Sequence, residues 1–164
     1  MIVPFVSVQD ANNLVVGTAN NGTHLTLELR NSHGGLKADV TAGAFPLFFG
    51  ISLFQVALYD DTGSAAYPVA GDVLTATLAS DAVITMPNSS LKGDSITDVV
   101  TGRCMPNVNF QLAAGFDFFY GKTDASGHFT RDVSSKVDLL RGDRVALTCL
   151  YRSGDTWSRE TVAQ

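Results

Sequence analysis

The segment Tyr120–Val133, YGKTDASGHFTRDV, brings together carboxylates, hydroxyls, a lysine and a histidine that could do chemistry. Oxygen atoms of this kind could hold Ca²⁺, which binds several oxygen ligands at once. The ligand spacing of an EF-hand loop is missing, however. Asp124 followed by Gly127 is typical of a tight turn, because aspartate accepts hydrogen bonds from nearby amides and glycine adopts a positive φ. The segment therefore predicts a hairpin turn, with no metal and no cofactor.

Catalytic residues are hard to nominate elsewhere in the chain. The histidines His24, His33 and His128 each lie in or beside an expected turn. Gly-x-Ser-x-Gly, a phosphate loop and His-Glu-x-x-His are all missing from the sequence. Asp60 and Asp61 are adjacent, and adjacent side chains on a strand point to opposite faces, so they would not form an acid–base pair. The sequence predicts that the protein is not an enzyme.

Composition limits the kind of partner. The 164 residues are 45% hydrophobic and 16% charged, which is typical of a globular chain. The formal net charge of −5 argues against nucleic-acid binding, since no basic stripe is present to neutralise phosphates. The first ten residues have neither the basic segment nor the long apolar core of a signal peptide.

One apolar run, Ala44–Tyr59, requires a separate interpretation. It is shorter than the roughly 20 residues that a membrane-spanning helix needs. Pro46, Gly50 and Gln55 also interrupt it. We expect one or two buried strands here and no membrane span.

Alternation with a period of two residues dominates the rest of the sequence. In Thr23–Leu29 the leucines alternate with polar residues, which indicates a half-buried strand. Similar segments are DVLTATL, VNFQL and RVALTCLY, and turn clusters rich in glycine, asparagine and aspartate separate them. No segment sustains the spacing of an amphipathic helix. The pattern predicts an all-β sandwich or barrel.

The two halves of the chain share a pattern. In each half a glycine is followed by an apolar pair, then by lysine and aspartate, and later by Gly-Asp ahead of an alternating strand. The spacing is the same in both halves up to the aspartate, which predicts two diverged copies of one β unit. The matching residues are Gly17, Leu25, Leu27, Lys37, Asp39 and Gly71 in the first half and Gly102, Phe110, Leu112, Lys122, Asp124 and Gly142 in the second.

The stretch GKTDASGHFTRDVSSKVDLLRGDRVALTCLYRSGDTW resembles the immunoglobulin-like modules of bacterial secreted and cell-surface proteins. The resemblance covers about 65 residues of the second half, and it reaches the first half only through the repeat. It implies a β-sandwich that serves as a spacer, adhesive or carbohydrate-contacting unit of a larger extracellular protein. The matching positions are Gly102, Pro106, Thr123, Asp124, Gly127, Phe129, Leu139, Gly142, Asp143 and Val145.

We therefore expect two immunoglobulin-like β-sandwich units in tandem. Residues 1–88 would form the first unit, enlarged by the apolar insertion, and residues 89–164 the second. The expected function is a non-catalytic extracellular or cell-surface module that interacts with a protein or carbohydrate, or acts as a spacer. The oligomeric state stays open.

The two cysteines bear on the cellular compartment. Cys104 and Cys149 have apolar counterparts, Ala19 and Leu78, in the first copy, so both sulfurs should point into the core. An immunoglobulin-type bridge between the two sheets would join them. The alternative is a pair of buried free thiols in a cytosolic protein.

Two alternative functions name particular side chains. A carbohydrate-binding module would use Trp157, Tyr151 and Tyr120, provided that these rings share an exposed face. An assembly subunit would instead pair with another chain through the apolar segment 45–58, where strand edges or apolar patches can associate. The contact residues would then be Phe48, Phe49 and Phe54.

Overall fold

The structure, a computed structural model, describes residues 5–9, 13–20, 22, 24–46, 51–77, 82–151 and 153–164. Over these residues every regular element is a β-strand, which confirms the predicted all-β class. Within the same ranges there is no helix that could cross a membrane.

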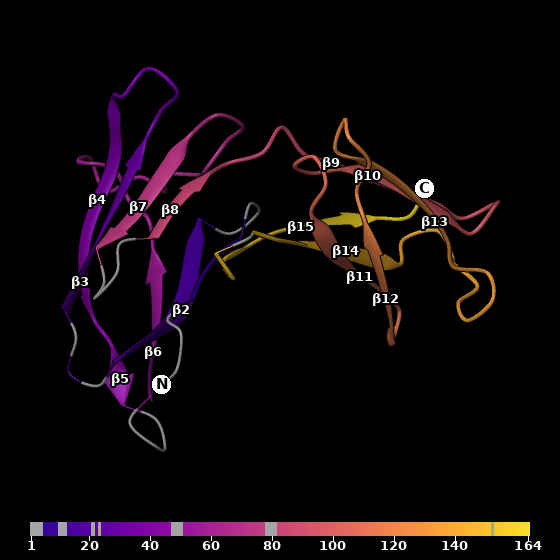
Figure 1. Ribbon diagram of the computed structural model, residues 1–164, viewed down its shortest axis with the longest axis horizontal. Helices are drawn as coiled ribbons and strands as arrows, with labels where there is room; N and C mark the ends of the chain where they lie inside the picture. Colours follow the sequence, from indigo (N-terminus) through magenta and orange to yellow (C-terminus); the bar gives the residue numbers. More distant parts are fainter. Residues whose placement is uncertain are drawn as a thin grey trace. The chain divides into compact units, whose positions relative to one another are not determined.

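The chain divides into two compact units. The first comprises Met1–Met86 with Ser153–Thr156, and the second comprises Pro87–Arg152 with Trp157–Gln164. Figure 1 labels strands of both units. The tandem arrangement and a boundary between residues 88 and 89 stay predictions.

The first unit places its strands in two layers. One layer has the neighbour order β1-β2-β6-β5 and the other has the order β4-β3-β7-β8. The printed pairings between these strands are antiparallel. The strands are β1 (Val6–Gln9), β2 (Leu14–Asn20), β3 (His24–Arg30), β4 (Leu36–Gly43), β5 (Phe45–Pro46), β6 (Ile51–Ala57), β7 (Val73–Thr77) and β8 (Ala82–Thr85).

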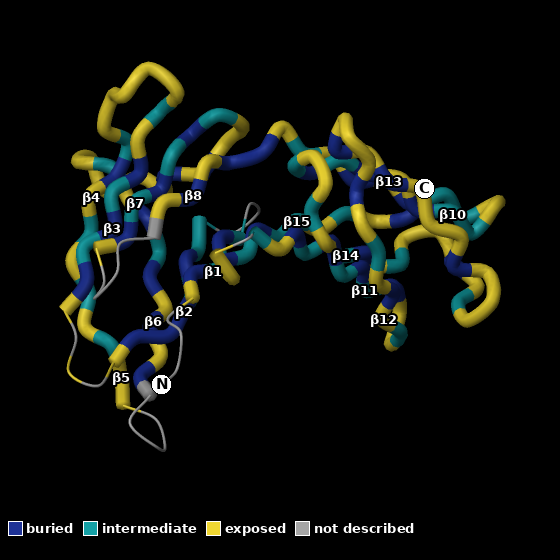
Figure 2. Tube along the Cα trace, viewed as in Figure 1, coloured by how far each residue is buried: buried dark blue, intermediate teal, exposed yellow. Residues whose placement is uncertain are grey.

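Alternation in the sequence produces the core of this unit. Along β3 the leucines Leu25, Leu27 and Leu29 are buried, while the residues between them are partly exposed. The same alternation along β7 is visible in Figure 2, where buried residues are dark blue. Burial of a leucine side chain contributes about 1.5–3 kcal/mol, so these positions hold the layers together.

The second unit repeats this plan. Its layers have the neighbour orders β9-β10-β13 and β12-β11-β14-β15. Two layers of this kind, packed through alternating inward-facing residues, form an immunoglobulin-like sandwich. The strands are β9 (Ser90–Asp94), β10 (Val99–Arg103), β11 (Asn109–Ala114), β12 (Asp117–Lys122), β13 (His128–Asp132), β14 (Arg144–Leu150) and β15 (Thr156–Val162).

The repeated glycine has the same neighbour in both units. Gly17 on β2 lies opposite Phe54 on β6, and Gly102 on β10 lies opposite Phe129 on β13. A Cβ atom on either glycine would collide with the phenyl ring of its partner. Glycine at these positions therefore makes room for a core aromatic ring.

The Gly-Asp pairs also form matching turns. Gly71 and Gly142 both have positive φ, 86° and 96°. The carboxylate of Asp72 accepts a hydrogen bond from the amide of Val69 at 3.0 Å. That of Asp143 accepts one from the amide of Leu140 at 2.9 Å. The two Gly-Asp turns therefore share a positive φ at glycine and a hydrogen bond to the aspartate carboxylate, as the predicted repeat implies.

Because the two halves share one pattern, a turn like that at Asp124 would be expected at its counterpart Asp39, and this expectation is wrong. Asp39 lies within β4 and faces Glu28 on β3, so this segment is a strand. Aspartate and glycine at suitable spacing favour a turn, but pairing with β3 on both sides of Asp39 overrides that local preference. The apolar run does supply strands, β5 and β6, but the expectation that they are buried is wrong for β5, which is exposed, and holds only at alternate positions of β6.

Candidate functional site

The turn that follows β12 is built by one carboxylate. Asp124 Oδ1 accepts hydrogen bonds from the amide and hydroxyl of Ser126, at 2.8 and 2.7 Å, and from the amide of His128 at 2.9 Å. Gly127 has a φ of 85°, and its amide donates to the Asp124 carbonyl. The predicted turn between two strands is confirmed, but it is not a hairpin: β12 pairs with β11, β13 pairs with β10, and the turn carries the chain from one layer to the other.

These hydrogen bonds hold Asp124 in its charged form. The Ser126 hydroxyl lowers the pKa of Asp124 most, and the His128 amide lowers it further. A carboxylate stabilised in this way is a poor general acid or base near neutral pH. Among the residues that the structure describes, no three acidic, histidine or cysteine side chains gather as metal ligands would.

The first unit contains two turns of the same kind. Asp60 Oδ1 accepts from the amide and hydroxyl of Thr62 and from the amide of Ser64, with Gly63 at a φ of 82°. Asn31 Oδ1 accepts from the amides of His33 and Gly35, each at 2.9 Å. Carboxylate and amide oxygens at these corners are engaged in shaping the backbone.

A hollow of about 740 Å³ lies in the first unit, beside the Asp60 turn. Its volume is within the range of small-molecule sites. The first residues of β4 form one side and the segment after β6 forms the other. Tyr59 and Tyr67 are each 50% exposed. The lining residues are Leu36, Lys37, Ala38, Asp39, Tyr59, Asp60, Asp61, Ala65, Ala66 and Tyr67.

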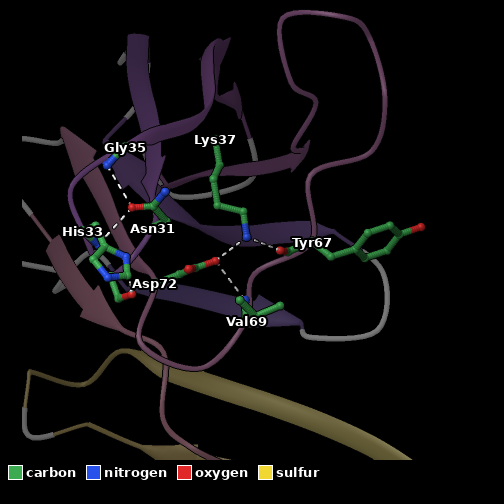
Figure 3. Close-up of polar contacts among 8 residues, drawn as sticks. Asn31, His33, Gly35, Lys37, Tyr67, Val69 and Asp72 are labelled. Carbon is green, nitrogen blue, oxygen red and sulfur yellow. Dashed lines mark hydrogen bonds and ion pairs between the residues drawn. The ribbon is translucent and has the colours of Figure 1, made fainter.

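A partly buried ion pair involves Lys37, one of the residues that line this hollow. The Lys37 ammonium lies 2.5 Å from Asp72, whose side chain is 2% exposed, and it donates to the Tyr67 carbonyl at 2.9 Å. Figure 3 shows Lys37 reaching from its strand to both groups, with the Tyr67 ring pointing away from them. The lysine thereby ties β4 to the loop that carries Tyr67.

The hollow has an excess of negative charge. Asp39, Asp60 and Asp61 border it, and Asp72 already balances the charge of Lys37. The Thr62 hydroxyl, followed by the Ser64 amide, lowers the pKa of Asp60, so this carboxylate stays ionised in moderate acid. The arrangement favours a cationic ligand over an anionic one.

A smaller hollow of about 430 Å³ lies beside the Asp124 turn in the second unit. Lys122 and Arg131 border it, together with His128 and Asp124, so basic side chains outnumber acidic ones. The ring of Phe110 forms part of its apolar wall and stacks on Phe129 with centroids 4.2 Å apart.

The aromatic residues proposed for carbohydrate contact have different exposures. Trp157 is 2% exposed, so its ring offers no face to a ligand. Tyr151 is half-buried. Tyr120 is 66% exposed on β12, where it lies opposite Gln111 on β11. Whether Tyr120 contacts a ligand stays a prediction.

The phenylalanines proposed as assembly contacts are not shown to be an exposed group. Phe54 is 1% exposed, because its ring packs over Gly17 within the first unit. Phe48 and Phe49 lie outside the described residues. Phe45, on β5, is 72% exposed and is thus an aromatic residue of segment 45–58 with a large exposed surface.

The predicted disulfide is confirmed. Cys104, directly after β10, is joined to Cys149 on β14. These two strands belong to different layers of the second unit, so the bridge connects the layers. Both cysteines are buried, as their apolar counterparts in the repeat indicated.

Sequence reasoning missed Tyr59 and Tyr67. Tyr59 was read as the end of the apolar run, and nothing in the spacing linked Tyr67 to it. The two lie on either side of the Asp60 turn, where Tyr59 forms an isolated bridge with Ala65. Tyrosines flanking an acidic turn are a weak signal, since such rings also pack at the rim of a sandwich.

No protein-family model matches the sequence, and neither does any curated protein. Similar solved structures include a BSP domain of a biofilm-associated protein, at 12% identity and a TM-score of 0.42. That similarity covers 98% of this chain and 29% of the other. At such identity and TM-score, it assigns neither a family nor an activity.

Two further similar structures come from different settings. An adhesin described as Ca²⁺-stabilised, which helps an Antarctic bacterium to bind ice, shows 15% identity and a TM-score of 0.36 over 99% of this chain and 49% of its own. The CD2-binding domain of CD58 shows 8% identity and a TM-score of 0.35, with 96% of both chains covered. Several similar structures, including an adhesin of Yersinia pseudotuberculosis, are thus domains of bacterial surface proteins.

Proposed function

We propose that the chain is a non-catalytic extracellular module, part of a larger bacterial surface or secreted protein, in which it acts as an interaction or spacer unit. Its partner would be a protein or a carbohydrate on a surface. In this role the two β units provide a rigid framework, and contacts are made by exposed side chains and loops.

The observation that carries this proposal is the Cys104–Cys149 disulfide. Disulfides persist in oxidising compartments such as the bacterial periplasm and the cell exterior, and they are rare in the cytosol. A bridge between the two layers also suits a small sandwich that must stay folded outside the cell.

The polar turns support the non-catalytic part of the proposal. Asp60, Asp124 and Asp143 each accept hydrogen bonds from amides of their own turn. Asp72 does the same and also pairs with Lys37. An acid or base in catalysis needs a carboxylate directed at substrate, and these four instead hold the corners of the fold.

The test combines location with thiol chemistry. Intact cells that naturally produce the protein would be treated with a membrane-impermeant amine label, and the chain would then be isolated under conditions that trap thiols. We expect labelled chains without free thiols. Two free thiols in an unlabelled chain would refute the extracellular assignment.

A further inference from the structure

We propose that the hollow in the first unit binds an extended segment of a partner protein through an arginine or lysine side chain placed between Tyr59 and Tyr67. This inference rests on the proposed interaction role and adds the chemistry of the partner. Three features of the same unit support it: an uncompensated negative charge, two exposed aromatic rings and a terminal strand.

The charge of the residues around the hollow favours a positively charged ligand. Asp39, Asp60 and Asp61 border the hollow, and the one lysine there is already paired with Asp72. Because that pair is largely withdrawn from solvent, Lys37 cannot swing out to neutralise the other three carboxylates without leaving Asp72 buried and unpaired. A cation from outside would balance them, whereas a phosphate, sulfate or acidic sugar would be repelled.

The tyrosines select the kind of cation. Tyr59 and Tyr67 keep half of their surface in solvent although both border the hollow. Their backbones are fixed, in Tyr59 by the bridge to Ala65 and in Tyr67 by the hydrogen bond from Lys37. A guanidinium or ammonium group over a tyrosine ring gains about 0.5–2 kcal/mol, and a backbone that is already fixed reduces the entropy lost on binding.

The strand at the edge favours an extended peptide over a free cation. β4 is a terminal strand in the order β4-β3-β7-β8, so one row of its backbone groups is not used by that sheet. Leu36–Asp39, at its start, borders the hollow. The register shifts between Leu29 and Arg30, which face Ala38 and Leu36, and the extra residue is Lys37. An added strand could pair with β4 beyond this bulge while its basic side chain enters the hollow.

Binding would be measured on the full chain by fluorescence anisotropy, with a short labelled peptide of alternating valine and threonine around a central arginine. A second peptide carries glutamine instead of arginine. We expect saturable binding of the arginine peptide that weakens as salt is raised, and at least about tenfold weaker binding of the glutamine peptide.

Variants locate the site. Tyr59→Ala and Tyr67→Ala should each weaken arginine-peptide binding by about 2- to 30-fold, the range that the cation–ring attraction implies. Tyr59→Phe and Tyr67→Phe keep the ring and should bind nearly as well as the unchanged chain. The double variant Asp39→Asn/Asp61→Asn should also weaken binding, and it leaves the Asp60 turn intact.

Matched controls lie in the second unit. Phe118→Ala removes a ring that is 53% exposed on β12, and Asp138→Asn removes an exposed carboxylate. Neither change should alter peptide binding. Equal losses for these controls would reveal non-specific attraction to an acidic protein and overturn the proposal.

The remaining outcomes are also decisive. Equal binding of both peptides, or binding that survives the two alanine variants, would refute the inference. So would tyrosine-dependent binding of a neutral oligosaccharide without binding of the arginine peptide, which would assign the hollow to a sugar. None of these results would change the location and thiol measurement, so failure here is distinguishable from failure of the extracellular role.

Discussion

Gly102 on β10 and Phe129 on β13 lie directly opposite each other, and the phenyl ring occupies the space that a side chain at position 102 would need. Gly17 and Phe54 have the same relationship in the first unit. Glycine normally weakens a strand, and an aromatic ring laid across it from the neighbouring strand compensates for the missing side chain. The repeated glycine is therefore a packing residue.

Gly102→Ala should destabilise the protein by about 1–3 kcal/mol, because the added methyl group displaces the Phe129 ring in a filled core. The free energy of unfolding from urea titration measures this loss. Gly43→Ala is the matched control, since Gly43 ends a strand and has no atom within 4 Å of an added Cβ. A loss at Gly102 no larger than at Gly43 would contradict the packing role.

Gly127→Val should cost more than Gly142→Val, although both glycines have a positive φ. A side chain at either position is strained by about 1–3 kcal/mol. At Gly127 a Cβ would also collide with the Cys104 carbonyl, whereas Gly142 has open space around it. Calorimetric melting temperatures compare the two variants. Equal shifts would mean that backbone strain accounts for the whole effect.

Thr123→Val tests a buried hydroxyl. Thr123 Oγ1 donates to the Met105 carbonyl at 2.6 Å and accepts from the Val108 amide at 3.0 Å. Valine has a similar shape but leaves both backbone groups without that partner, so we expect a loss of about 1–3 kcal/mol in the free energy of unfolding. Thr130→Val, on an exposed position of β13, should change stability little. Comparable losses would refute the role of the hydroxyl.

Local patterns predicted most of the strands and the turn at Asp124. Leucines alternating along β3 can form a stable strand only with one face buried, and Asp124 with Gly127 has few conformations other than a turn. Both signals act over a few residues, so they can be recognised without knowledge of the fold. The disulfide could also be predicted, because Cys104 and Cys149 occupy apolar positions of the repeat and both side chains were therefore expected in the core.

Contacts between distant segments could not be predicted in this way. The hollow requires β4 to approach the loop at Tyr67, and the Lys37–Asp72 pair that joins them spans 35 residues. The spacing of apolar and polar residues within either segment does not indicate that the two segments meet. Trp157 illustrates the same limit, since an aromatic residue beside a turn can be exposed or buried, and packing decides which. Asp39 shows it for the backbone, where pairing with β3 overrides a turn-like sequence.

Acid should reduce the contribution of the Asp124 turn to stability. Hydrogen bonds from Ser126 and His128 lower the pKa of this carboxyl below its ordinary value. The folded state therefore binds the proton less readily than the unfolded state. The stabilisation is complete above the unfolded pKa, near 4, and is lost as pH falls through the lower folded pKa.

The measurement is the melting temperature of the unchanged chain minus that of Asp124→Asn, followed from about pH 6 to about pH 2. We expect this difference to shrink as the carboxylate is protonated. Ser126→Ala removes the hydroxyl that lowers the folded pKa most, so in that background the change should be smaller and should be complete at higher pH. A difference that is constant over this range would show that the charge of Asp124 does not stabilise the turn.

Removal of the disulfide should be the most destabilising of these changes. Cys104 and Cys149 are 45 positions apart, and closing a loop of that length in the unfolded chain contributes about 4 kcal/mol in the chain-entropy model. Cys104→Ala/Cys149→Ala removes the bridge without leaving a reactive thiol in the core.

Urea unfolding of this variant, compared with the oxidised and the reduced unchanged chain, separates loss of the bridge from loss of sulfur packing. The reduced chain should retain the packing and lose the bridge, so its stability should lie near that of the double variant. A reduced chain as stable as the oxidised one would mean that packing between the layers, and not the covalent link, keeps the second unit folded.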